Sequence, residues 1–463
     1  MFEIERGKPL HCVEMVTGKS LTGTLLISVE EISARIYSYT EFFFIEDNDQ
    51  PVILLTETNH IVSLHSNITT VPGRTSRTIE PKRTIHRQDF VSNLAIVGHD
   101  PWMSHDKVKR VTFVVEHTKQ LMRHKRKVKA IGRGRYPKEG DLTIFTDDAQ
   151  GMTLRAGYTA TYGSEFDSPK ELWPGFEIEF DAPQSTTDYI VHVSDYVDFL
   201  SFCLGVKLKP TAIRVDRISF DQMKAAVKSQ SYLGDHGVHY VWPETEIDKR
   251  DLWVGGSPVR SWDDEELSSF RACLVAWMNR AAEWRRSYAL MMVSFGAKNV
   301  ISAERLINAC RWLEEVPIAQ SQNALSSEEV EAISTAATQK AHELGHHQII
   351  RERIAGAVKR VRAESAEERF TRLVAMLEEK FGKGILRGSV VAHLKRAIQF
   401  RSRVAHGHFN PESDVEFRAF AKSTKAMEAF CYLLTALDLP ISKMGLERIR
   451  SNPLVRDYKH AYD

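Results

Sequence analysis

The sequence predicts an α+β protein, with a mostly antiparallel, sandwich-like β domain followed by an all-helical bundle. Short segments rich in β-branched and aromatic residues, separated by turn formers, recur over residues 9–220, as expected for strands. From Asp263 onward, apolar residues follow helical spacing instead. We therefore predict a β-rich domain over residues 1–227, a connector over 228–262 and a helical domain over 263–463.

The first half contains segments typical of strands at 21–27, 111–115 and 176–180. The last of these alternates strictly between apolar and acidic residues, which indicates a strand buried on one face. Apolar residues at helical spacing predict one helix in this half, near Ser194–Leu204.

The predicted connector is rich in turn-forming residues, namely Gly234, Gly237, Pro243, Gly255, Gly256 and Pro258. The helical domain then opens with four acidic residues at 263–266, which favour the positive end of a helix dipole. Further helices are expected at about 302–316, 327–361, 366–381, 388–405 and 415–437.

Composition restricts the classes of function. The formal charge of the 463 residues is +1, so attraction to nucleic acid must come from local patches. The first residues lack the apolar run of a signal peptide, and no run of about 18 apolar residues occurs, so we expect no membrane span. The five cysteines contain no C-x-x-C pair, which argues against a zinc ribbon or disulfide framework and favours a cytoplasmic protein.

The most informative motif places Arg401 five residues before His406. An imidazole can move the proton of an RNA 2′-hydroxyl while a guanidinium stabilises the charge developing on phosphorus, so this pair can cleave RNA without metal. On one ideal helix the two side chains lie about 140° apart. They can converge only if the helix ends at the motif, for which Gly407 is the expected C-cap, or if the long arginine side chain reaches around the helix. The alternative is a basic helix end that complements the helix dipole.

A second register has the same spacing, from Arg403 to His408. The first register is preferred because Ala405-His406-Gly407 is the more familiar ending of such a motif.

A basic block covers residues 123–138, with eight Lys or Arg and no Asp or Glu. Such a block would attract a phosphate backbone without reading sequence. The candidate RNA-binding residues are Arg123, Lys125, Arg126 and Lys127 of this block, together with Arg403. A solvated, mobile loop between strands is the alternative.

A literal H-E-x-x-H motif is present at His342, Glu343 and His346. On a helix this spacing puts two imidazoles on one face, able to bind zinc, with the glutamate as general base. The metzincin extension is absent, because Ile349 and Glu352 stand where glycine and histidine would be needed. A solvent-facing polar stripe on one long helix is the alternative.

Residues 397–407 resemble the signature helix of HEPN domains, which carries an R-x4–6-H motif. Residues 303–316 resemble the helix that precedes it in ApeA-like HEPN proteins. In the first half, the L-x-G-x-L run at 21–25 and the segment 90–99, followed by Trp102, are similar to strands of the same family.

This resemblance implies an anti-phage defence protein that acts by abortive infection through a C-terminal HEPN ribonuclease. It places Arg401 and His406 at the two defining positions of the motif. It implies a homodimer or higher oligomer, a host RNA such as tRNA as substrate, a phage-derived trigger and no cofactor. The residue after the arginine is commonly asparagine in the family, and here the supporting position is Ser402.

Three hypotheses follow. The first is a metal-independent endoribonuclease that leaves a 2′,3′-cyclic phosphate or its hydrolysed form. The second is a zinc metalloprotease acting through the H-E-x-x-H motif. The third is a catalytically inactive HEPN-like module that binds RNA or dimerises, for which the serine after the arginine and the second register are the supporting features.

Overall fold

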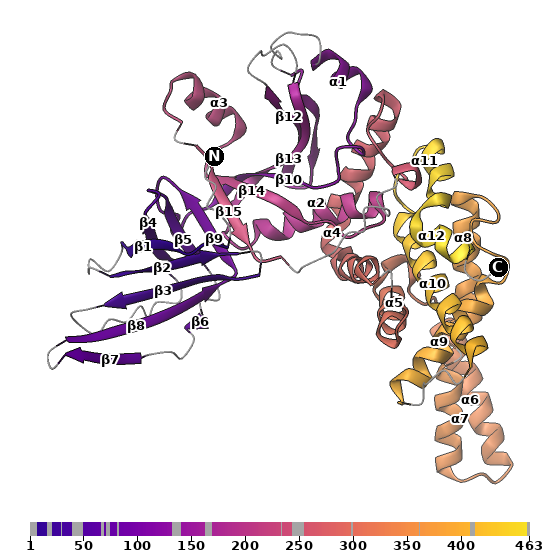
Figure 1. The fold of residues 1–463 in the computed structure, drawn as a ribbon. Helices are drawn as coiled ribbons and strands as arrows, with labels where there is room; N and C mark the ends of the chain where they lie inside the picture. The colour runs from indigo at the N-terminus through magenta and orange to yellow at the C-terminus, as the bar shows by residue number, and fades with distance from the viewer. Residues whose placement is uncertain are drawn as a thin grey trace. The chain divides into compact units, whose positions relative to one another are not determined.

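The structure, a computed structural model, describes residues 7–15, 21–28, 30–38, 50–65, 69–70, 75–80, 83–131, 140–162, 169–232, 234–242, 254–297, 300–360, 362–407 and 413–460. The chain divides into two compact units. Unit 1 holds residues 1–203, 207–252 and 260–279, and unit 2 holds 204–206, 253–259 and 280–463. The predicted α+β class is confirmed, with the sheet in the N-terminal half and an all-helical region at the C-terminal end (Figure 1).

The first nine strands of unit 1 pair antiparallel with their neighbours. They are β1 (Leu10–Glu14), β2 (Thr22–Ile27), β3 (Ile32–Ser38), β4 (Val52–Thr56), β5 (Ile61–His65), β6 (Thr69–Thr70), β7 (Thr75–Glu80), β8 (Arg83–Ser92) and β9 (Leu94–Gly98). Seven of them follow one another across the sheet in the order β9-β5-β4-β1-β2-β3-β8.

This seven-strand run curls around its own core. Its two end strands, β8 and β9, are separated in sequence by Asn93 alone, so the ends of the run must approach each other. Phe90 of β8 and Val97 of β9 accordingly belong to one buried apolar cluster with residues of the strands between them. Ser92 Oγ, at the end of β8, donates to the carbonyl of His65, at the end of β5, at 2.6 Å.

The same hydrogen-bonded sheet continues through six further strands. They are β10 (Val108–Val115), β11 (Thr143–Ala149), β12 (Met152–Tyr162), β13 (Pro169–Gln184), β14 (Pro210–Asp216) and β15 (His236–Tyr240). They are ordered β11-β12-β13-β10-β14-β15, and β15 pairs with β9. The described strands of the β-rich domain, which was expected to be sandwich-like, therefore form one continuous antiparallel sheet.

One face of this second part is apolar and is covered by helix α2 (Tyr189–Leu204). Tyr196 of α2 packs its ring against Phe113 and Phe176, each at 5.3 Å between centroids. The unit 1 portion of α4 (Asp264–Gly296) packs on α2 in turn, where Trp277 Nε1 donates to the carbonyl of Asp195 at 2.9 Å. The strict alternation of residues 176–180 produces this face, because every second side chain points into it.

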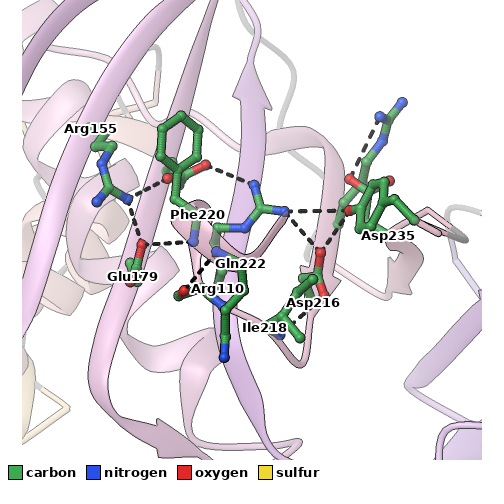
Figure 2. A network of polar contacts seen from close by, with 12 residues as sticks. Arg110, Arg155, Glu179, Asp216, Ile218, Phe220, Gln222 and Asp235 are labelled. Atoms are coloured by element: carbon green, nitrogen blue, oxygen red, sulfur yellow. Dashed lines mark hydrogen bonds and ion pairs between the residues drawn. The ribbon is translucent and has the colours of Figure 1, made fainter. Parts of the chain in front are cut away.

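The opposite face carries a partly buried ionic network (Figure 2). Arg110 donates to Glu177 at 3.1 Å and to Asp216 at 2.9 Å, and Arg155 donates to Glu177 at 2.6 Å and to Glu179 at 2.8 Å. The first turn of helix α3 (Phe220–Lys228) is attached here, because its Phe220 N–H donates to Glu179 at 3.1 Å. Each carboxylate is already matched by a guanidinium, so the network joins strands and helix.

Two sequence expectations about element boundaries need correction. The glycine-rich range 228–262 contains strand β15, whose residues pair with β14 and β9 on both sides. A short strand containing Gly237 is stabilised by these distant partners, which local composition does not reveal. The long helix expected over 327–361 is two helices, α6 (Ser327–Glu343) and α7 (Gln348–Arg360), which pack against each other (Figure 1).

The other helices of unit 2 lie close to their predicted ranges. They are α5 (Ala303–Glu315), α8 (Ala366–Phe381), α9 (Val390–Ala405) and α10 (Asp414–Ala436), followed by the short α11 (Lys443–Arg448) and α12 (Pro453–Lys459). Unit 1 has one further helix, α1 (Lys125–Ile131). None of the helices in the described ranges is long and apolar enough to cross a membrane.

Helix α10 is the centre of unit 2, because from Phe420 to Ala436 nearly all of its residues are buried. Helices α5, α9 and α12 pack around it. Arg305 of α5 makes a two-pronged ion pair with Glu428 of α10, at 2.8 and 2.7 Å. Both side chains are at most 3% exposed. Burial raises the pKa of Glu428, and the Arg305 guanidinium opposes that rise.

We predict that the stability of the β unit falls in mild acid because of His65. Burial lowers the pKa of this imidazole from 6.5 to about 4. Between these two pH values the unfolded chain binds a proton that the folded chain does not, so stability decreases as pH falls through the window, by at most about 3 kcal/mol. Urea unfolding of His65→Gln at pH 7 and pH 4.5 should show a smaller loss than the wild type, and an equal loss in both proteins would contradict this.

We predict that Arg305→Met destabilises unit 2 by about 3 kcal/mol, because it leaves a buried carboxylate without its partner. The double variant Arg305→Met/Glu428→Leu should recover most of the loss. The matched control is Lys395→Met, which removes an exposed ion pair to Glu367 and should cost less than about 1 kcal/mol. Denaturant unfolding measures all three, and equal losses in Arg305→Met and the control would refute the role of burial.

Candidate functional site

The Arg401/His406 motif lies where helix α9 ends. Ala405 is the last helical residue, His406 is the C-cap, and Gly407 takes a left-handed conformation with φ of 71°. The His406 N–H donates to the carbonyl of Ser402 at 3.2 Å, and the Gly407 N–H donates to that of Val404 at 3.0 Å. The predicted helix end at the motif is therefore present, and it leaves the imidazole of His406 exposed.

Arg401 is held by a carboxylate of a neighbouring helix. Its guanidinium donates through Nη1 to Glu314 Oε1 and through Nη2 to Glu314 Oε2, the second at 3.3 Å. Glu314 is near the end of α5, which packs against α9. The two side chains are 34% and 49% exposed, so solvent screens their attraction and the pair contributes no more than about 1 kcal/mol.

Within the described part of the chain, no hydrogen bond joins Arg401 to His406. The guanidinium points to α5, while the imidazole extends from the end of α9. Arg401 is partly exposed and His406 is exposed, so both groups are accessible from solvent.

Two residues beside Arg401, Ser402 and Arg403, make contacts of their own. Ser402 has an exposed side chain, and its carbonyl caps the helix. Arg403 pairs with Glu416 of α10 at 2.5 Å. The alternative histidine of the second register, His408, lies outside the described residues.

The basic block belongs to unit 1, and its described part begins helix α1. Arg126 forms an ion pair with Asp264, and Lys127 donates to the carbonyl of Thr143. Lys125 lies over the Trp262 ring at 5.7 Å, whereas Arg123 is exposed. The expected loop is thus helical as far as Ile131, and residues 132–139 lie outside the described part.

The H-E-x-x-H motif does not lie on one helix. Helix α6 ends at Glu343, and Gly345 takes a φ of 77°, so His346 falls in the turn before α7. The one-face geometry that zinc coordination by this motif requires is therefore absent. The alternative is right that these residues face solvent and wrong that they lie on one long helix. Glu343 instead pairs with Lys340 at 2.9 Å. In the described ranges, no group of three His, Cys, Asp or Glu side chains is placed to hold a metal ion.

His393, which belongs to none of the sequence motifs, lies three turns before the end of α9. Its Nδ1 is 2.9 Å from the Tyr458 hydroxyl of α12. Burial and the positive charges of Lys422, Arg396 and Arg387 lower its pKa. The sequence alone indicates that His393 and Arg396, three residues apart on one helix, are neighbours. The contacts with Lys422 of α10 and Tyr458 of α12 depend on the fold.

If Arg401 contacts RNA, as its motif predicts, Glu314→Gln should tighten RNA binding about two- to fivefold, because it removes a negative charge that competes with phosphate for Arg401. The measurement uses a His406→Ala background, so that bound RNA is not consumed. Glu315→Gln, one residue along the same helix, is the control for overall charge. Equal changes in the two variants, or weaker binding in Glu314→Gln, would contradict the competition.

Comparison with known proteins does not place the chain in a family. No family model, no curated protein and no solved structure matches it. The geometry of its own residues is therefore the basis for assigning a function.

Proposed function

We propose that the protein is a metal-independent endoribonuclease of the HEPN type, with Arg401 and His406 as its catalytic residues. The observation that carries the proposal is the termination of α9 at the motif, which leaves the His406 imidazole exposed one and a half turns beyond a half-exposed Arg401. A basic helix end needs no such arrangement to complement the dipole. The resemblance of residues 397–407 to the HEPN signature helix supports the same assignment.

The chemistry needs only proton transfer and charge stabilisation. The 2′-hydroxyl of RNA attacks the adjacent phosphorus, and His406 accepts its proton. Arg401 stabilises the additional negative charge on the phosphoryl oxygens. The 5′-oxygen of the next nucleotide leaves and takes a proton from water, and the His406 imidazolium returns its proton to solvent. The products are a 2′,3′-cyclic phosphate and a 5′-hydroxyl.

We infer that two chains complete the site. Among the described residues, Arg401 bonds to Glu314 and makes no hydrogen bond to His406, and a composite site could take one group from each copy. A phosphate can replace Glu314 on Arg401, because a half-exposed ion pair is weak. Arg396 and Lys422, near His393, are further cations available for the RNA backbone.

The cellular role that fits this activity is abortive anti-phage defence in the cytoplasm. Cleavage of a host RNA such as tRNA would halt phage propagation. In this proposal the β-rich unit receives a phage-derived trigger or keeps the nuclease inactive until infection. Part of the basic block, with Arg123 exposed on unit 1, offers a second contact for RNA.

One observation favours a second candidate, a HEPN-like module that binds RNA or dimerises without cleaving. Arg401 is already neutralised by Glu314, and Ser402 stands at the position where the family commonly has asparagine. Binding without cleavage by the wild type would support this candidate.

We predict that His406→Ala lowers RNA cleavage by at least about a hundredfold, because general acid–base catalysis is lost. Arg401→Ala should lower it by about 10² to 10³, as loss of an electrostatic stabiliser does. Cleavage by the wild type should persist in excess EDTA. Gel analysis of a labelled RNA, with circular dichroism to check folding, measures each effect.

The matched control is His346→Ala, which removes another exposed histidine of unit 2 and should leave cleavage unchanged. Full cleavage by His406→Ala would refute the assignment. Loss of cleavage in EDTA would refute metal independence separately.

A further inference from the structure

Unit 1 contains a cavity of about 360 Å³ at the edge where three neighbouring strands meet their connections. It lies past the end of β10, at the start of β14 and at the end of β15. Its volume is in the range of natural small-molecule sites, about 300–1,000 Å³. All the lining residues belong to unit 1, away from the Arg401/His406 motif in the sequence.

The floor and one wall of the cavity come from one face of the sheet. Ile213 of β14 and Val238 of β15 are paired across the strands, are buried and line the cavity. Tyr240 ends β15 and lines the cavity as well, because alternate side chains of a strand share a face. Trp242, two residues beyond the end of the strand, is also a lining residue.

The two aromatic residues form a stacking surface. Their ring centroids are 5.0 Å apart with planes inclined by 60°. Both side chains are half-buried, so each ring is partly supported by the protein and partly accessible. Such a pair suits a flat aromatic ligand, because every nucleobase has a π-face that stacks on Trp or Tyr.

Two charged residues also line the cavity. Lys209 lines the cavity and forms no ion pair within the described ranges, so its ammonium is available to an anion. Glu116 also lines the cavity, and its weak contact to His117 Nε2 is 3.7 Å long. A cation, a carboxylate acceptor and an aromatic pair match the phosphate, the hydroxyl or amino groups, and the base of a nucleotide.

We propose that this cavity binds a nucleoside monophosphate. The base stacks on Trp242 and Tyr240, the phosphate pairs with Lys209, and Glu116 accepts a hydrogen bond from the ribose or from an amino group of the base. The proposal is independent of RNA cleavage, since it concerns binding by unit 1. A nucleotide bound there would be a ligand of the β-rich unit and not a substrate of the motif at the end of α9.

The test is calorimetric titration of the full chain with AMP, GMP, CMP and UMP. We expect at least one to bind with a Kd below about 1 mM. Trp242→Ala should weaken that nucleotide and its nucleoside by about tenfold or more, whereas Lys209→Met should weaken the nucleotide about tenfold and leave the nucleoside unchanged. Inorganic phosphate alone should bind more weakly than the nucleotide.

The matched controls are Trp173→Ala and Lys119→Met, which alter another Lys–Trp pair of unit 1, 5.1 Å from ammonium to ring, and should leave binding unchanged. Trp242→Phe keeps a stacking ring, so it should retain binding while losing nucleotide-induced quenching of tryptophan fluorescence. Absence of binding by all four nucleotides, or equal binding by wild type, Trp242→Ala and Lys209→Met, would overturn the proposal.

Discussion

The helical unit depends on the buried ion pair between Arg305 and Glu428. Two charges placed in an apolar interior are costly unless each satisfies the other, so their geometry permits little variation. Here both prongs of the guanidinium are used, and Arg305 Nη1 also donates to the carbonyls of Ala297 and Val300 at 2.9 and 3.0 Å. The pair therefore fixes α5 on α10, and α9 packs against both helices. The position of the Arg401/His406 motif follows from that arrangement.

The ion pair at the Arg401/His406 motif is exposed to solvent, unlike the buried Arg305–Glu428 pair. The Arg401–Glu314 pair is half-exposed and weak, so a phosphate can replace the carboxylate without a large change in energy. The buried Arg305–Glu428 pair holds the helices in place, and the exposed Arg401–Glu314 pair can be exchanged. This combination suits a site whose residues are fixed in position and yet remain accessible to a ligand. The ionic network of unit 1 is of the first kind, since Arg110 is buried and has both Glu177 and Asp216 as partners (Figure 2).

Local signals in the sequence predicted the elements that local chemistry determines. Alternation at 176–180 predicted a strand, and Gly407 predicted where α9 stops. Gly345 carried the same kind of signal, since it takes a φ of 77° between α6 and α7, yet one helix was expected over 327–361. Contacts between residues far apart in the sequence could not be predicted from local patterns. Glu314 is 87 residues from Arg401. Strand β15 is stabilised by its pairing with β14 and β9, which its own sequence does not indicate.

The central claim is that a 2′-hydroxyl, and not a metal-activated water, attacks phosphorus at the Arg401/His406 site. The most direct measurement is the chemical identity of the ends produced when the protein cleaves RNA in excess EDTA, determined by mass spectrometry. We expect a 2′,3′-cyclic phosphate, or the monophosphate from its hydrolysis, together with a 5′-hydroxyl. Products with a 3′-hydroxyl and a 5′-phosphate would contradict it.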